Sequence, residues 1–396
     1  MGREGGRPSN EEPLLRNRSR SFAGGLVFGL YRISGVMLSG ARSLLLASFL
    51  SIAPAIPLPV LFAATDPVPA PGGSGKQAAA PREDRPKACL DLAGLVPFTG
   101  DLPDGWSVAE PGSDRTLDST TSRGVSLVLA SLRRSGIVPA EEADVAIRTT
   151  TGGFQAVYAL LPPPATAGDP GEILREAVMG SGAAAKSFGR VLLLAATTDR
   201  EALHVLADKL FEKMAKQLHA RTMKADSEGD SSRVVLCMED FLAADPANAP
   251  VHLALAEHLL LRSNPPDLRG ALRHFESALD PSAGQALPPS DRWRALLGKG
   301  QAQQLLGAAS ASLQTLRAAL AAADGDEQRA SIEYTLAASE AALGNKKKAI
   351  EALARSFEAS RHAGRPGPAS MAGRDASFLT LAGEPAFRQL LEKYSP

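Results

Sequence analysis

Apolar and small residues recur at helical spacing through the last third of the chain, and the pattern itself repeats. The pair Leu306–Gly307 is followed by small and apolar positions, and the pair Leu343–Gly344, which begins 37 residues later, is followed by similar residues at the same offsets. Self-similarity at such a period predicts stacked pairs of helices, because each pair can bury its apolar face only against its neighbours. The helices that we expect cover residues 234–243, 250–262, 267–279, 291–306, 309–323, 327–343 and 346–360, with two short helices in the tail that follows.

The middle of the chain has a mixed pattern. Short apolar or alternating runs predict strands, and Gly152–Gly153 predicts a hairpin turn between two of them. The segment 171–179 is expected to be helical. The strands that we expect cover residues 125–132, 145–150, 154–160 and 189–196.

A longer helix is predicted after the last of these strands. Thr198 and Glu201 have the spacing of a capping box, in which the threonine oxygen accepts from an orphan amide and the glutamate reaches back. The apolar residues that follow at helical spacing form one stripe that would pack on the sheet; they are Leu203, Leu206, Leu210, Met214 and Leu218. Residues 220–231 are rich in charge and are interpreted as a connector. The order of elements predicts an α+β domain at 89–222, a small sandwich of mostly antiparallel strands, followed by an all-α helical-hairpin array at 232–396.

The hairpins of this array resemble the tetratricopeptide repeat (TPR). The resemblance covers residues 232–396 and rests on small, apolar and aromatic positions: Ala271, Phe275 and Ala278 in one unit, Gly300, Ser312, Leu316 and Ala319 in the next, and Ala337, Ala349, Leu353 and Ser356 in the last. A long loop at 282–290 departs from the family pattern, and so does the lack of a large aromatic residue early in each first helix. The resemblance implies a right-handed superhelix whose concave face holds a peptide or helix of a partner protein. It assigns no individual ligand-binding residue. Ala319 and Ala349 are expected at helix crossings, where interaxial distances of about 8 Å require a small side chain.

The amino terminus differs in charge from the rest. Residues 1–65 contain seven Arg against three Glu, and no residue from 43 to 65 is charged. A basic flank before an uncharged apolar run predicts that residues 37–65 are a signal peptide or a membrane anchor, and the pattern leaves both open. Translation from Met37 would place residues 1–36, otherwise a basic disordered extension, outside the protein. Residues 66–88 are rich in Pro, Gly and Ala and predict a linker.

The chain has two cysteines, Cys89 and Cys237, near the two ends of the expected α+β domain. In an exported protein they could form a disulfide. Their spacing matches no known framework, however, so two free thiols are the favoured interpretation.

Residues of the types used in catalysis are present, but no arrangement of them indicates a reaction. Gly72–Lys76 lacks the first glycine and the Ser/Thr of a phosphate-binding loop. His252 and His258 are six residues apart, which does not place them on one helix face as a metal pair requires. The acids Glu141, Glu142 and Asp144 are expected on a solvated loop. We therefore assign no catalytic, metal or cofactor-binding residue and expect no enzyme activity.

The remaining sequence signals concern partners. Basic and acidic residues balance at 43 each, so the composition does not favour a nucleic-acid partner. Lys346–Lys348 opens a helix, where a solvated helix start is favoured over contact with a phosphate or an acidic partner.

Together these features predict an extracytoplasmic, bacterial protein-interaction module, secreted or anchored to the membrane by residues 37–65, whose helical array docks a partner protein. Two alternatives remain open. The α+β domain could be an enzyme or a small-ligand domain with regulatory repeats, or the chain could be a structural component of a cell-envelope assembly.

Overall fold

The computed structural model describes residues 89–109, 119–150, 152–161, 174, 178, 181, 183–197, 199–280, 286–365 and 368–394. All of them belong to one compact unit, Gly40–Pro396. The basic extension, the signal or anchor and the linker expected in residues 1–88 lie outside the described residues, and so does most of the helix expected at 171–179. None of the described helices combines the length and apolar character that crossing a bilayer requires.

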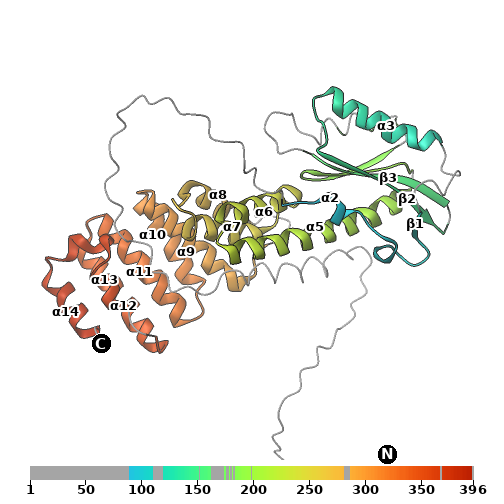
Figure 1. Ribbon diagram of the computed structural model, residues 1–396. Helices are drawn as coiled ribbons and strands as arrows, with labels where there is room; N and C mark the ends of the chain where they lie inside the picture. Colours follow the sequence, from blue (N-terminus) through green and yellow to red (C-terminus); the bar gives the residue numbers. More distant parts are fainter. Residues whose placement is uncertain are drawn as a thin grey trace, which may run out of the picture. The chain divides into compact units, whose positions relative to one another are not determined.

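A five-stranded antiparallel sheet precedes a long series of helices (Figure 1). The strands are β1 (Ser107–Ala109), β2 (Glu141–Thr149), β3 (Gly152–Leu160), β4 (Ala184–Phe188) and β5 (Val191–Ala195), and their order across the sheet is β1-β2-β3-β5-β4. β2 and β3 form the expected hairpin, but its turn lies before Gly152 and not at Gly152–Gly153. These two glycines begin β3 and pair with Thr149 and Arg148. The strand expected at 189–196 is confirmed as β5, whereas its antiparallel neighbour β4 has no counterpart in the prediction.

Short helical segments and one long helix accompany the sheet: α2 (Leu92–Leu95), η1 (Thr99–Asp101), α3 (Ser119–Arg134) and α5 (Arg200–Glu228). The helices of the array are α6 (Ser231–Ala244), α7 (Ala249–Leu261), α8 (Leu268–Leu279), α9 (Pro289–Leu305), α10 (Ala309–Ala321), α11 (Asp326–Ala342) and α12 (Lys346–His362), followed by α13 (Ala369–Ala372), η2 (Ala376–Leu381) and α14 (Pro385–Tyr394). The helices predicted in the array are confirmed to within a few residues at each end. The tail has three short helical segments rather than the expected two.

Both faces of the sheet are covered. Alternate residues of β3 face opposite ways, so that Tyr158 joins the core formed with α2 and α5, while Val157 joins the core formed with α3. Figure 1 shows α3 on one face and α2 with α5 on the other. The two central strands β3 and β5 are therefore nearly continuous apolar runs, as strands buried on both faces must be.

The strand predicted at 125–132 is wrong, because this segment is part of helix α3. Val125, Val128 and Leu132 are buried at helical spacing, whereas Leu127 is 52% exposed. A continuous apolar run does not distinguish a strand from a buried helix by itself. The exposed leucine inside the run concealed the helical period.

The acids near the start of β2 are also placed differently from the prediction. Glu141, Glu142 and Asp144 lie in strand β2, not on a loop. Glu142 forms an ion pair with Arg133 of α3 at 2.7 Å, and Glu141 accepts from the backbone N–H of Leu92 at 3.3 Å. These carboxylates thus contact the helices on either side of the sheet.

Helix α5 differs from the prediction at both ends. Its N-cap is Asp199, whose carboxylate accepts from the N–H groups of Glu201 and Ala202. The N-cap is therefore one residue later than the predicted Thr198, which lies outside the described residues. The helix continues through Glu228 and ends at Gly229 in the left-handed conformation. Most of the predicted connector 220–231 is therefore helical, and only Gly229 and Asp230 separate α5 from α6. Good helix formers with charged side chains suit a solvated helix as well as a linker.

The repeated Leu-Gly pairs mark helix ends. Gly307 and Gly344 have φ values of +82° and +75°, a conformation that costs glycine little and other residues more. The N–H of Ala308 donates to Gln303 and that of Asn345 donates to Glu340, which closes the last turns of α9 and α11. The 37-residue period is thus the repeat of one helix–turn–helix geometry.

Small residues let the array helices approach closely. All the residues on which the repeat resemblance rests are buried, including Ala319 and Ala349. A Cβ added to Gly298 of α9 would lie 2.2 Å from the ring of Phe275, and one added to Gly300 would lie 2.7 Å from Leu316. The helices α8 and α10 therefore pack onto α9 through glycine contacts.

We expect Gly298→Ala to destabilise the protein. Alanine favours a helix over glycine by about 1 kcal/mol, but the added carbon clashes with Phe275, which is fully buried and cannot move aside. Overpacking costs about 1–3 kcal/mol, and contacts of 2.2 and 2.5 Å with a ring place the cost at the upper end, about 2–3 kcal/mol. After the gain in helix propensity is subtracted, the net loss of unfolding free energy should be about 1–2 kcal/mol, measured by chemical denaturation. The control Gly383→Ala meets open space and should change stability by less than about 0.5 kcal/mol. An unchanged stability of Gly298→Ala would contradict the packing described here.

Candidate functional site

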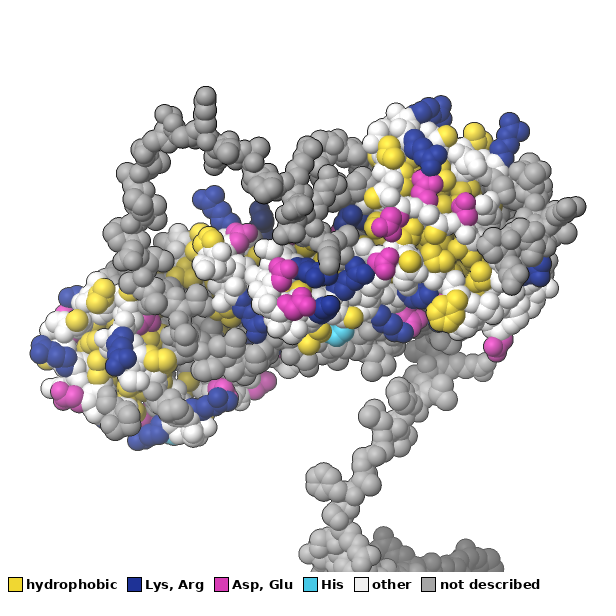
Figure 2. Space-filling model, viewed as in Figure 1, with side chains coloured by type: hydrophobic (Ala, Val, Ile, Leu, Met, Phe, Trp, Pro, Cys, Tyr) yellow, Lys and Arg dark blue, Asp and Glu magenta, His cyan; other side chains and the backbone are white. Residues whose placement is uncertain are grey.

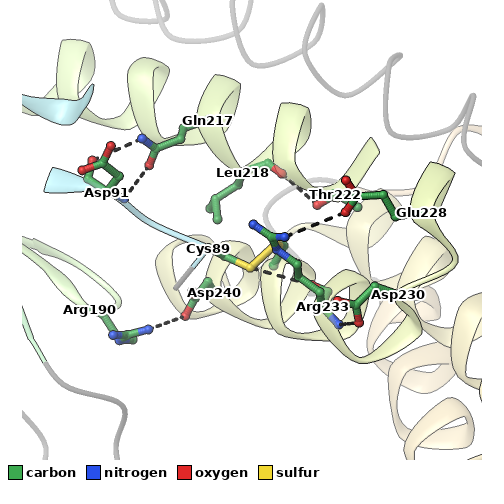
Figure 3. Close-up of a disulfide and its surroundings, with 11 residues drawn as sticks. Cys89, Asp91, Arg190, Gln217, Leu218, Thr222, Glu228, Asp230, Arg233 and Asp240 are labelled. Carbon is green, nitrogen blue, oxygen red and sulfur yellow. Dashed lines mark hydrogen bonds and ion pairs between the residues drawn. A yellow bond between two sulfur atoms is a disulfide. The ribbon is translucent and has the colours of Figure 1, made fainter. Parts of the chain in front are cut away.

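Cys89 and Cys237 form a disulfide, which corrects the expectation of two free thiols. The bond joins the segment before α2 to helix α6, and both residues are fully buried. Figure 3 shows the disulfide and the segment that carries Cys89 lying beside helices α5 and α6. The sequence separation of 148 residues gives no local signal, because only the tertiary packing brings the two cysteines together.

Polar contacts hold the same segment on α5. Gln217 of α5 accepts from the backbone N–H of Asp91 at 2.9 Å and donates to its carbonyl oxygen at 3.2 Å. Lys213 forms an ion pair with Asp101 at 2.5 Å and donates to the carbonyl oxygen of Val96. These contacts join groups of the protein to one another and fix the segment on α5.

The turn between β4 and β5 contacts α6. Gly189 has a φ of +54°, and a Cβ there would lie 2.8 Å from that of Ala243. The next residue, Arg190, lies 3.5 Å from Asp240 and also donates to the carbonyl oxygen of Leu161. Burial raises the pKa of Asp240, and Arg190 partly offsets this effect. The pair joins the sheet to the first helix of the array (Figure 3).

The array contains a close histidine pair that the sequence did not indicate. Nδ1 of His252 in α7 lies 2.9 Å from Nδ1 of His274 in α8, and Nε2 of His252 lies 3.0 Å from the carbonyl oxygen of Pro246. A carbonyl oxygen accepts only, so the proton of His252 is on Nε2 and its Nδ1 accepts from His274. His258 has a different partner, the hydroxyl of Ser231 at 2.8 Å.

Burial lowers the pKa of these histidines. The effect is largest for His274, where burial and the neighbouring His252 and Arg273 outweigh Asp267 and lower the pKa to about 4. Burial also lowers the pKa of His252 and His258. At neutral pH the pair is uncharged. Within the described parts of the chain, no group of three or more His, Cys, Asp or Glu side chains is arranged to hold a metal ion.

A pocket of about 320 Å³ lies in the array between the second helices of two successive hairpins. It is lined by Arg317 and Leu320 of α10, Leu336 and Glu340 of α11, and Lys348, Glu351, Ala352 and Arg355 of α12. Leu336, Glu340 and Ala352 are buried and form its floor, whereas the cations and Glu351 are exposed at its rim. We call this feature the α10–α12 pocket. Of the residues in the predicted Lys346–Lys348 cluster, it is Lys348 that reaches this pocket.

Two carboxylates of α11 at this pocket are buried and partnered. Glu333, next to the pocket, accepts two hydrogen bonds from Arg355 at 2.8 and 2.9 Å. Glu340 accepts from the side-chain amide of Asn345 at 2.7 Å. Arg317 and Lys348, by contrast, have no hydrogen-bond or ion-pair partner among the residues that the structure describes.

Comparisons of the sequence with models of protein families, with curated proteins and with solved structures find no match. The surface itself must therefore indicate the function. On the face drawn in Figure 2, basic and acidic side chains are interspersed and do not gather in one patch of a single sign.

The disulfide should contribute substantially to stability. A cross-link that closes a loop of this length restricts the unfolded chain, and such bonds contribute about 2–5 kcal/mol. We expect dithiothreitol to lower the unfolding free energy by that amount in chemical denaturation. The double variant Cys89→Ala/Cys237→Ala should show the lower stability with and without reductant. A wild-type stability that does not respond to reductant in the unfolding transition would contradict a bond between these two residues.

The histidine pair should make stability depend on pH. Because the pKa of His274 is about 4 in the folded chain and 6.5 is its ordinary value, the unfolded chain binds this proton more readily, and stability falls as pH drops from about 6.5 towards 4. Between pH 7 and pH 5 the wild type should lose about 1–2 kcal/mol more than His274→Gln, measured by urea denaturation. The pKa values of Glu239 and Glu257 are raised, so these two acids increase stability as pH falls. They do so in both the wild type and His274→Gln, and their effect cancels in the difference between the two proteins. Parallel pH profiles would show that His274 is not buried as described.

Proposed function

We propose that this chain is an extracytoplasmic protein-interaction module and that its helical-hairpin array, which is similar to tetratricopeptide repeats, docks a partner protein. The observation that supports this most strongly is the packing at α9. Gly298 and Gly300 admit Phe275 and Leu316 of the flanking helices, and the small and apolar positions on which the resemblance rests are buried. A stack of such hairpins presents a long surface that each helix pair extends by one step. The resemblance implies that the concave face of this stack receives a peptide or helix of the partner.

The location outside the cytoplasm has its own support. Disulfides persist in secreted and periplasmic proteins and are rare in the cytosol of most organisms. The bond between Cys89 and Cys237 therefore agrees with the basic flank and the uncharged run at 43–65, which predict export. If residues 37–65 are not cleaved, they anchor the module to the membrane.

Binding, rather than catalysis, is the activity that the described side chains favour. The buried ionisable groups are engaged in contacts between elements: Asp240 with Arg190, Glu333 with Arg355, and His258 with Ser231. The α10–α12 pocket lies in the array and not in the sheet domain. These observations support a protein as the proposed partner.

Site-specific photo-crosslinking in intact cells tests the proposal with the full chain. A photoreactive amino acid is placed at Arg292 of α9 or at Gln314 of α10, both exposed on the array, and for comparison at Leu127, which is exposed on α3. We expect a defined crosslinked partner from the two array positions, recovered in the cell-envelope or secreted fraction, and none from Leu127.

Products from Leu127 alone, or from none of the three positions, would contradict docking by the array. Recovery of the protein in the cytoplasmic fraction with both cysteines open to alkylation would contradict export, and it would leave docking to be judged by the crosslinks.

A further inference from the structure

The α10–α12 pocket is lined by three cations and two acids, but these charges are not all paired with one another. Arg355 carries a bidentate hydrogen bond to the buried Glu333, and its pKa is raised first by this bond and also by the nearby Glu351. Glu340, at the floor, is bound by Asn345. The acids of the pocket therefore have partners or lie close to Arg355.

The other two cations of the pocket have no such partners. Arg317 and Lys348 line it from α10 and from α12, on either side of the floor, and neither forms an ion pair or side-chain hydrogen bond with another described residue. Two long basic side chains that flank one hollow attract a negatively charged group, and an Arg can bind a carboxylate by two parallel hydrogen bonds.

Apart from Glu340, which Asn345 binds, the floor between these cations is apolar. Leu320, Leu336 and Ala352 line the pocket, and a cavity of about 320 Å³ lies at the lower end of the range for ligand sites, which is about 300–1,000 Å³. This space accepts a few side chains rather than a folded domain. Apolar floors with a few polar groups at the rim are typical of sites where an anchor residue is buried and its neighbours fix the orientation.

We propose that the α10–α12 pocket binds an acidic peptide segment of a partner protein, with an apolar side chain on Leu320, Leu336 and Ala352 and a flanking Asp or Glu between Arg317 and Lys348. The proposal rests on the function proposed above, in which the array docks a protein. It adds a contact surface between two second helices to the concave face that the repeat resemblance implies. The segment that this surface selects combines an apolar side chain with a neighbouring carboxylate.

Selection from a library of random 12-residue peptides displayed on phage, with the purified full-length protein as the target, tests this proposal. We expect enrichment of peptides in which Asp or Glu lies next to Leu, Ile or Phe. Synthetic versions of the selected peptides, labelled with fluorescein, should lose at least tenfold in affinity for Arg317→Glu/Lys348→Glu in fluorescence polarisation. The matched control Arg329→Glu/Lys347→Glu makes the same change in net charge at exposed residues of α11 and α12 that do not line the pocket, and it should bind as the wild type does.

Circular dichroism and thermal unfolding verify that both double variants remain folded, which the exposure of all four side chains favours. Acidic peptides that bind equally to wild type and Arg317→Glu/Lys348→Glu would overturn the pocket and leave docking by the array intact. Equal losses in both double variants would mean nonspecific charge attraction and would also overturn it. Enrichment of basic or uncharged peptides, or of no peptide, would overturn the acidic-segment inference. Docking of a folded partner is judged separately by the crosslinks described above.

Discussion

The packing of α5 against the sheet on one side and α6 on the other is the interaction on which the described structure depends. Leu206, Leu210 and Met214 of α5 belong to the same buried cluster as Tyr158 and Leu193 of the sheet. That cluster continues without a break through α6, α7 and α8 to Ala302 of α9. A single apolar core of this kind couples the sheet to the first hairpins, because removing either part exposes the surface that the other buries. At the same junction, the disulfide links Cys89, in the segment before α2, to Cys237 of α6.

Beyond α9 the array has smaller cores. One cluster joins α9, α10 and α11, and another joins α11, α12 and the short helices of the tail, with Phe357 and Phe378 at its centre. Each is formed by neighbouring elements, as expected when stability is the sum of contacts between adjacent repeats. Helix α11 belongs to both, so it carries buried residues on two sides. This explains why its acids Glu333 and Glu340 are buried and why each must have a hydrogen-bond partner, since an unpaired buried carboxylate is costly.

The burial of those acids determines the character of the neighbouring surface. Arg355 is held by Glu333 and Asn345 by Glu340, and a residue that satisfies a buried acid is less free to meet a ligand. Arg317 and Lys348 remain available because neither forms an ion pair or a side-chain hydrogen bond with another described residue. The surface chemistry of the array therefore follows from what its interior requires. The proposed binding pocket and a stable core thus belong to the same three helices.

The sequence by itself determined the helical hairpins of the array, their turns and most of the strands. These features follow from local rules: apolar residues at helical spacing, a glycine that can adopt positive φ at Gly307 and Gly344, and short apolar or alternating runs in the strands. The hairpin turn itself was placed slightly too late, because Gly152 and Gly153 are paired residues of β3. The sequence failed at α3, where an exposed Leu127 concealed the period, and at the cap of α5, where Asp199 is the N-cap and either of two adjacent residue types suits that position. What only the tertiary structure decided are contacts between residues far apart in the chain: the bond from Cys89 to Cys237, the hydrogen bond between His252 and His274, and the α10–α12 pocket. No pattern along the chain encodes these contacts, because each depends on how helices that are separately predictable come to lie against one another.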